Sequence, residues 1–116
     1  MGSLEMLRSR LDFAALQTDA RSRIDPLLVL RYRRNDLDRT RYGISTGRRT
    51  GSAVVRNTIR RRLRRLLVVL AGRVAQGWDV LIIARPPAAA ASQAQLGEAL
   101  ERLLRQSGIA RAESAA

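Results

Sequence analysis

The chain of 116 residues lacks cysteine and histidine, and arginine is its only basic residue type. Without cysteine it cannot form disulfides, thiolate nucleophiles or zinc–sulfur sites. Without histidine it has neither imidazole acid–base chemistry nor histidine metal ligands. Its serine and threonine hydroxyls therefore lack a histidine or lysine to activate them. We expect no catalytic residue, no metal site and no small-molecule substrate, which favours a binding protein or the non-catalytic subunit of an enzyme.

Long hydrophobic runs are also missing. No apolar stretch approaches the ~20 residues that span a bilayer, and charged residues interrupt the first apolar stretch, which argues against a signal peptide. The hydrophobic fraction of 46% is nevertheless enough for a folded core, and the length suits one domain. We expect a cytoplasmic protein without a membrane partner.

The two ends of the chain have weaker patterns than its middle. We expect a single domain over residues 9–108, between a flexible N-terminus at 1–8 and a flexible C-terminal tail at 109–116. Met1-Gly2-Ser3 resembles a cloning remnant ahead of a natural start at Met6.

Positive charge dominates the chain and is concentrated in one segment. The formal net charge is +12 at pH 7 and the pI is near 11.8. Eight arginines lie between Arg48 and Arg65, with no acidic residue among them. Like charges at this density repel one another, so the segment is stabilised when a polyanion neutralises it. Nucleic acid is the commonest polyanion in a cell, and an anionic membrane surface is the main alternative.

The same segment has a helical pattern, with Ser52 suited to an N-cap and Gly72 to the C-terminal end. Apolar residues recur between them at spacings of three and four: Val55, Ile59, Leu63, Leu66, Leu67 and Leu70. The opposite face carries Asn57, Arg60, Arg61 and Arg64, flanked by Arg62 and Arg65. The pattern predicts an amphipathic helix with an arginine-rich outer surface.

Arginine in this position suits recognition of phosphate. Guanidinium groups bind phosphate oxygens in pairs. Arg56 and Asn57 fall in the first turns, where free N–H groups and the helix dipole also attract anions. The Asn57 amide can both donate and accept, so it can contact a base edge or a 2′-hydroxyl.

The remaining elements predict an α+β fold, because strands and helices do not strictly alternate. We expect a helix at 9–17, strands at 27–34 and 39–46 paired as a hairpin, a strand at 80–84 and a helix at 92–108. Ser9 and Asp12 have the spacing of a capping box, as do Ser92 and Gln95. The apolar run at 80–84 is typical of a central strand buried on both faces.

Aromatic residues are scarce, although they are the usual stacking platforms for single-stranded RNA. The four are Phe13, Tyr32, Tyr42 and Trp78. Phe13 on the first helix is placed to face a cleft, and Tyr42 lies beside Arg41. We expect Tyr32 and Trp78 in the core.

Residues 51–65, Gly-Ser-Ala-Val-Val-Arg-Asn-Thr-Ile-Arg-Arg-Arg-Leu-Arg-Arg, resemble the signature of the protein component of bacterial ribonuclease P. That family has a Gly-x-Ala-Val-x-Arg-Asn-x-Ile-[Lys/Arg]-Arg-x-[Leu/Ile]-Arg block. Residues 42–49 (Tyr-Gly-Ile-Ser-Thr-Gly-Arg-Arg) and 79–86 (Asp-Val-Leu-Ile-Ile-Ala-Arg-Pro) are similar to two further family segments. Leu11-Asp-Phe13 and residues 98–104 resemble parts of its first and last helices. The likeness covers nearly the whole chain in order and spacing.

The resemblance implies a protein subunit that assists a catalytic RNA. In that family the holoenzyme hydrolyses a phosphodiester of precursor transfer RNA and releases the 5′ leader, with Mg²⁺ bound mainly by the RNA subunit. The implied partners are ribonuclease P RNA and precursor transfer RNA. The implied fold is a two-layer α/β sandwich in the order α-β-β-β-α-β-α, with a four-stranded sheet, three helices and a left-handed crossover around the basic helix. Its fourth strand would be short, near residues 48–54.

The resemblance also implies residue roles. Contacts to the catalytic RNA fall on Arg56, Asn57, Arg60, Arg61, Arg64 and Arg65, and loop contacts to RNA on Arg48 and Arg49. The leader cleft falls on Phe13, Leu28 and Leu30. Thr58 replaces the second arginine of the common Arg-Asn-Arg, for which Arg62 or Arg65 would compensate. Gln17 and Leu30 stand where aromatic residues are common, so the stacking platform for the leader is reduced.

Two other functions are consistent with the residues alone. A general RNA-binding or ribosome-associated protein would use the same basic helix without a nuclease RNA. A membrane-active basic helix would bind anionic vesicles, although so small a domain needs the apolar stripe of that helix to cover its sheet.

Overall fold

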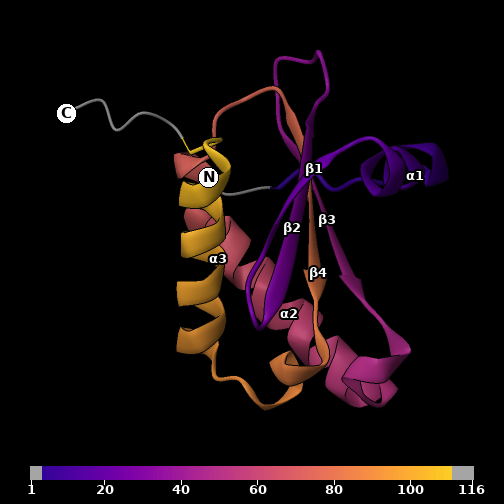
Figure 1. The fold of residues 1–116 in the computed structure, drawn as a ribbon, viewed down its shortest axis with the longest axis vertical. Helices are drawn as coiled ribbons and strands as arrows, with labels where there is room; N and C mark the ends of the chain where they lie inside the picture. Colours follow the sequence, from indigo (N-terminus) through magenta and orange to yellow (C-terminus); the bar gives the residue numbers. More distant parts are fainter. Residues whose placement is uncertain (1–3, 111–116) are drawn as a thin grey trace.

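The computed structural model describes residues 4–110 and shows a four-stranded sheet with three α-helices (Figure 1). The elements, in chain order, are α1 (Arg10–Thr18), β1 (Arg21–Ile24), β2 (Leu28–Arg34), β3 (Arg41–Thr46), α2 (Ala53–Leu70), β4 (Trp78–Ala84) and α3 (Gln93–Ser107). Three short 3₁₀ helices are interspersed: η1 (Arg48–Thr50), η2 (Ala71–Arg73) and η3 (Pro86–Ala90). The predicted α+β class and the order α-β-β-β-α-β-α are confirmed.

The ends of α2 and α3 follow the capping residues of the sequence. Ser52 Oγ accepts a hydrogen bond from the Val55 N–H at the start of α2. Ser92 and Gln95 form a complete capping box at the start of α3. Gly108 then ends α3 in the left-handed conformation, at φ 79°, which glycine adopts without strain.

The start of α1 differs from the expected capping box. Ser9 Oγ accepts a hydrogen bond from the Leu11 N–H, so Ser9 is the N-cap as predicted. The Asp12 carboxylate instead accepts hydrogen bonds from the Arg41 guanidinium on β3. The acid of the first turn therefore ties α1 to the sheet.

The strand order is β1-β2-β4-β3, so the predicted hairpin between β2 and β3 is wrong. β4 lies between them, antiparallel to β2 and parallel to β3. The register gives a physical reason, because Asp79 of β4 is paired with Arg33 of β2 and with Arg41 of β3. Direct pairing of β2 with β3 would set arginines beside one another, and like charges on neighbouring strands are destabilising. The apolar run of β4 takes the central position that its sequence predicts.

The fourth strand is β1, not the predicted segment at 48–54. Within that segment residues 48–50 form the 3₁₀ helix η1, and α2 begins at Ala53. All four residues of β1 are exposed, and the strand pairs only with β2, antiparallel. An edge strand of this kind has no apolar alternation to mark it in the sequence.

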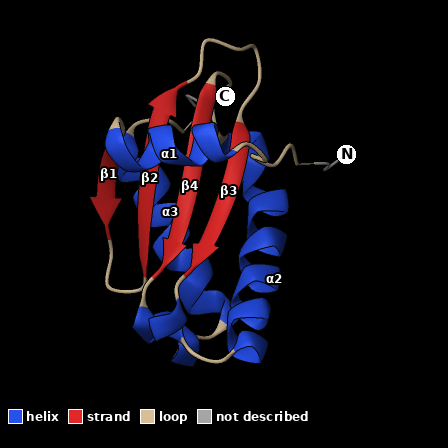
Figure 2. Cartoon of the chain, turned by 90° about the vertical axis from the view of Figure 1, so that its right-hand side faces the viewer, coloured by secondary structure: helices blue, strands red, loops and turns tan. Residues whose placement is uncertain are grey.

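The two faces of the sheet are covered unequally (Figures 1 and 2). α2 and α3 pack on one face, which we call the helical face, and enclose the main core. α1 lies across part of the other face, which we call the open face; its strand residues include Val29, Arg31, Gly43, Leu81 and Ile83. A small second cluster of Leu7, Leu16 and Leu81 packs beneath α1.

The connection from β3 through α2 to β4 joins two parallel strands. In Figure 2, α1 faces the viewer, β3 and β4 point downward, α2 lies behind the sheet, and the chain moves leftward from β3 to β4. This path is a left-handed crossover, the opposite of the usual hand. The crossover hand implied by the family resemblance is confirmed.

Both ends of the described chain contact the sandwich. The Leu7 N–H donates to the Tyr42 carbonyl, and the Tyr42 N–H donates to the Glu5 carbonyl, so residues 5–7 run beside β3. Ile109 is buried and Ala110 forms a bridge with Val74. The expected cloning remnant and most of the expected C-terminal tail lie outside the described residues.

Candidate nucleic-acid interface

The outer side of α2 carries a surface dense in positive charge. Its apolar stripe is inside, with Ile59 exposing 2% of its area and Leu63 and Leu67 none. The exposed residues between positions 57 and 65, which we call the α2 arginine surface, are Asn57, Arg60, Arg61, Arg64 and Arg65. No ion pair with an acid in residues 4–110 neutralises these arginines. The amphipathic helix is thus confirmed, and all the predicted contact residues of α2 except Arg56 share its exposed side.

Arg60 links the start of this surface to the sheet. Its Nη1 donates to Asn57 Oδ1 at 2.8 Å, and its Nη2 donates to Thr46 Oγ1 at 2.7 Å, at the end of β3. The carbonyl of the Asn57 side chain is therefore engaged, while its amide nitrogen is left to donate outward. Bidentate use of Arg60 within the protein orders both side chains before any ligand arrives.

Arg56 and Arg62 lie at the two margins of the helix and are half-buried. The Arg56 Nε is buried and has no hydrogen-bond partner. Arg62 Nη1 donates to the Ala91 carbonyl at 3.1 Å, which joins α2 to the segment before α3. Of the two residues expected to compensate for Thr58, only Arg65 is exposed. Arg62 instead binds the Ala91 carbonyl within the protein.

Arg48 and Arg49 lie on η1, directly before α2, and both are exposed. Their 3₁₀ turn is closed by the hydrogen bond from the Thr50 N–H to the Gly47 carbonyl. The two guanidinium groups therefore add to the positive end of the α2 dipole. The structure places these predicted loop residues beside the α2 arginine surface.

The three residues of the predicted leader cleft lie on different faces of the sheet. Phe13 of α1 lies on the open face, against Gly43, where an added Cβ would come within 2.9 Å of the ring. Leu28 and Leu30 are fully buried in the core on the helical face. The prediction that these two leucines line the cleft with Phe13 is therefore wrong, because side chains alternate along β2 and theirs point to the opposite side.

The open face below α1 has a different set of residues. The register aligns Ile24, Val29, Ile83 and Ser45 in one row across the four strands. Ile24 is 68% exposed, and the other three are half-buried. Val29 lies between Leu28 and Leu30 on β2, so its side chain must point to the face opposite theirs. Alternation along β2 should therefore have indicated this row, together with Phe13 above it, as the surface beneath α1.

Ion pairs fix α1 over the open face. The Arg41 guanidinium donates to Asp79 Oδ2 at 2.7 Å and to Asp12 Oδ2 at 3.2 Å, so it bridges β4 and α1. Hydrogen bonding with Asp79 raises the pKa of Arg41, so the bridge stays charged. Arg31 on β2 donates to the carbonyls of Leu16 and Gln17 at the end of α1, which satisfies part of its C-terminus.

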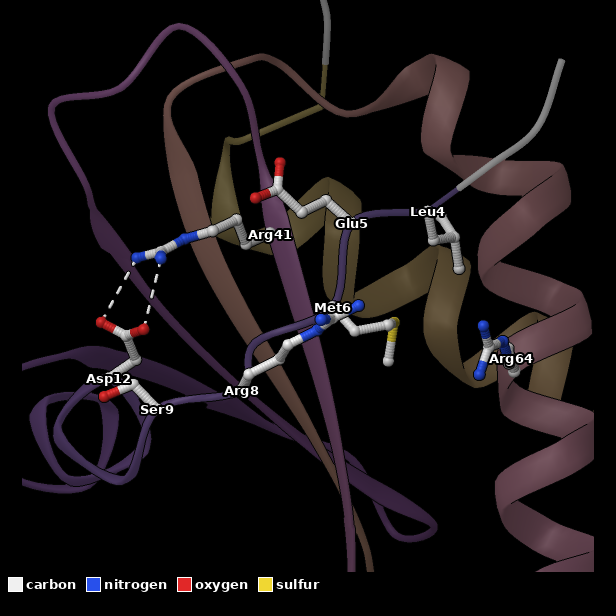
Figure 3. A pocket seen from close by; sticks show the side chains of 8 residues that line it. All are labelled: Leu4, Glu5, Met6, Arg8, Ser9, Asp12, Arg41 and Arg64. Carbon is white, nitrogen blue, oxygen red and sulfur yellow. Dashed lines mark hydrogen bonds and ion pairs between the residues drawn. The ribbon is translucent and has the colours of Figure 1, made fainter.

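A cavity of about 550 Å³ connects the α2 arginine surface with the α1 side of the molecule (Figure 3). Arg64 of α2 lines one side, and Arg8 of the N-terminal segment lines another. Asp12 and Arg41 also line it, and the carboxylate of Asp12 points toward the Arg41 guanidinium. Arg8 and Arg64 have no acidic partner within residues 4–110, so positive charge continues from α2 toward α1.

Comparison with known proteins decides the family. The family model described as Ribonuclease P matches residues 1–108. The chain belongs to the ribonuclease P protein family. It is 36% identical over 104 residues to the ribonuclease P protein component of Roseiflexus castenholzii, covering 89% of this chain and 85% of that protein. It is 34% identical over 108 residues to that of Symbiobacterium thermophilum, covering 92% and 94%.

Solved structures of ribonuclease P proteins have the same fold. The Staphylococcus aureus ribonuclease P protein superposes with a TM-score of 0.84 at 27% identity, covering 92% of this chain and 98% of that one. The Thermotoga maritima protein gives a TM-score of 0.80 at 28% identity, with coverage of 88% and 96%. An RNA partner follows from membership of the ribonuclease P family.

None of the helices in residues 4–110 is both long and apolar enough to cross a bilayer. The acidic side chains of these residues do not gather in groups of three or more that could hold a metal ion. Sequence reasoning missed one pairing of a basic with an aromatic residue. Trp78, expected in the core, is half-buried. The Arg34 guanidinium lies over its ring, 5.3 Å from the centroid.

Proposed function

We propose that this protein is the protein subunit of ribonuclease P, which binds the catalytic RNA through α2 and the 5′ leader of precursor transfer RNA through the open face. In this role it assists the hydrolysis that generates the mature 5′ end, in the cytoplasm. The observation that carries the proposal is the α2 arginine surface, which is exposed and has no ion pair with an acid in residues 4–110, in a chain that belongs to this family.

Electrostatics explains why such a subunit would help an RNA enzyme. Catalytic RNA and substrate are both polyanions and repel each other. A chain with a net charge of +12 placed between them lowers that repulsion and releases counterions from both. The expected consequence is tighter substrate binding and a lower requirement for Mg²⁺.

The open face suits a single strand more than a duplex. It offers one aromatic ring, Phe13, and a mostly apolar row of side chains, in which Val29 and Ile83 are half-buried. Bases of an unpaired leader can stack on the ring and cover this row. Positive charge for the leader backbone is supplied from the α1 side, where Arg8 and Arg64 flank the cavity.

The proposal assigns Mg²⁺ mainly to the RNA subunit. The role of this chain is to bind, orient and neutralise, and no step of the reaction is assigned to one of its side chains.

The test is cleavage of a precursor transfer RNA with a 5′ leader by a bacterial ribonuclease P RNA at low Mg²⁺, with and without the protein. We expect stimulation by the wild type and its loss in the triple variant Arg56→Ala/Asn57→Ala/Arg61→Ala. Tight but indiscriminate binding of structured RNAs without stimulation would refute the proposal and support a general RNA-binding protein.

A further inference from the structure

A second basic cavity lies at the opposite edge of the sheet from α2, where α1 ends, β1 begins and β2 ends (Figure 2). Its volume is about 550 Å³, within the range of sites for small ligands. The side chains that matter here are Arg21, Arg33, Arg34, Trp78, Tyr32 and Asp19. None of them belongs to the α2 arginine surface or to the row of the open face.

The cavity exists because β1 is shorter than β2. The last pair between them joins Arg21 to Tyr32, and β2 continues for two more residues, Arg33 and Arg34. The outer edge of β2 is therefore uncovered at these two arginines. On its other side β2 is still paired with β4, where Arg34 stands directly opposite Trp78.

The cross-strand pair of Arg34 and Trp78 presents a flat cationic surface. The Arg34 guanidinium carbon lies 5.3 Å from the centroid of the indole, a cation–π distance. Tyr32 supports the indole from another side, edge-on, with ring centroids 5.9 Å apart. Because Arg34 is exposed, the guanidinium face turned away from Trp78 is open, and nucleobases stack on such planes.

The charge of the cavity also favours a nucleotide. Three arginines line it against one acid, Asp19, which gives a net charge of +2. Asp19 lies 3.6 Å from Arg33 with 83% of its side chain exposed, so this pair is weak. Arg21 and Arg34 form no ion pair within residues 4–110. Arg21 is thus available to phosphate, Arg33 can join it because its pair with Asp19 is weak, and Arg34 is left for the base.

We propose that this cavity binds an unpaired nucleotide of RNA. The base stacks on the open face of Arg34, and Arg21 and Arg33 bind the phosphate. The inference rests on the proposed function for the source of the nucleotide, which is either the precursor leader or the ribonuclease P RNA. The site itself requires only single-stranded RNA, so it is testable without cleavage.

Trp78 makes the test direct, because it is the only tryptophan of the chain. A single-stranded RNA of about five nucleotides, a length that one binding site accommodates, is titrated against the fluorescence of Trp78. We expect saturable quenching in the wild type. In Arg34→Ala we expect affinity about tenfold weaker, because the base loses the plane on which it stacks.

The matched control is Arg105→Ala, which removes one exposed arginine from α3 and should leave the titration unchanged. Circular dichroism of each variant checks that it is folded. The reverse change, Asp19→Asn, should tighten binding because it removes the one negative charge of the cavity. Quenching that does not saturate, that keeps its wild-type affinity in Arg34→Ala, or that weakens equally in Arg105→Ala would overturn the proposal.

The source of the nucleotide is found with the assembled enzyme. If it comes from the leader, Arg34→Ala weakens binding of a precursor with a long leader and not of one with a very short leader. If it comes from the catalytic RNA, Arg34→Ala weakens assembly of the protein with that RNA, and the effect does not depend on leader length. If Arg34→Ala changes neither precursor binding nor assembly with the catalytic RNA, the proposal that this site acts in the enzyme is overturned. The proposed function is tested separately, by the loss of cleavage stimulation in the α2 variants.

Discussion

The bridge of Arg41 between Asp79 and Asp12 gives the sharpest prediction for the fold around the open face. Asp79 exposes 5% of its side chain and accepts hydrogen bonds from Arg41 Nε and Nη2, at 2.9 and 2.7 Å, and from Asn35 Nδ2 at 2.9 Å. Asp12 exposes 29% and accepts from Arg41 at 3.2 and 3.4 Å. The perturbation is Asp79→Ala, compared with Asp12→Ala.

The expected costs differ because the two carboxylates are buried to different degrees. Removing one member of a buried ion pair costs ~3–5 kcal/mol. Since Arg41 keeps Asp12 in the Asp79→Ala variant, we expect the lower end, a loss of about 3 kcal/mol in the free energy of unfolding. Asp12 is more exposed, and the Asp12→Ala variant keeps the pair between Arg41 and Asp79. We therefore expect this variant to lose only about 1 kcal/mol in the free energy of unfolding.

Urea unfolding at pH 7, followed by circular dichroism, measures both free energies. Asp12→Ala should in addition weaken leader binding, because it releases the start of α1 and with it Phe13. A loss below about 1 kcal/mol for Asp79→Ala, or equal losses in the two variants, would refute the reasoning that Asp79 is the principal partner of Arg41.

Three further predictions follow from particular contacts. Gly43→Ala should displace the Phe13 ring, since the added Cβ would lie 2.9 Å from it, and weaken leader binding while costing about 1–3 kcal/mol in urea unfolding. Burial raises the pKa of Tyr42 from 10.0 to about 12; the unfolded chain loses that proton first, so stability present below pH 10 should fall as the pH rises toward 12, and Tyr42→Phe should flatten this decline. Arg61→Ala/Arg65→Ala should lower the slope of log affinity for ribonuclease P RNA against log salt by ~1–2, about 0.7–0.9 for each lost phosphate contact.

Elements with a strong local signal could be predicted from the sequence. The stripe from Val55 to Leu70 and its N-cap define α2, the box of Ser92 and Gln95 defines the start of α3, and a continuous apolar run defines β4. The exposed arginines follow directly from the same periodicity, because the side opposite a buried stripe must face solvent.

Elements whose position is set by long-range pairing could not be predicted from the sequence. β1 consists of four exposed residues, and the strand is formed by pairing with its neighbour β2. The insertion of β4 between β2 and β3 depends on contacts between segments about forty residues apart, such as Arg41 with Asp79. Hairpin rules describe only neighbours in the chain, so they favoured the wrong partner.

The candidate site divides in the same way. Alternation along the strand places Leu28, Leu30 and Tyr32 on one face of β2, as the structure has them, but it does not say which face α1 covers. The resemblance assigned two of these residues to the cleft, and the structure turns them to the core. The Arg34–Trp78 pair depends on the register of β2 with β4, which no local pattern encodes.

The central claim is that the α2 arginine surface is where this protein binds ribonuclease P RNA. The most direct test is the affinity of the protein for that RNA at fixed salt, for Arg61→Ala/Arg65→Ala and for the control Arg73→Ala/Arg105→Ala, which removes the same charge from residues outside this surface. The account predicts a loss of about tenfold or more for the α2 pair, as expected for two direct contacts, and a much smaller loss for the control. Equal losses in the two variants would contradict it, because binding would then follow net charge rather than this surface.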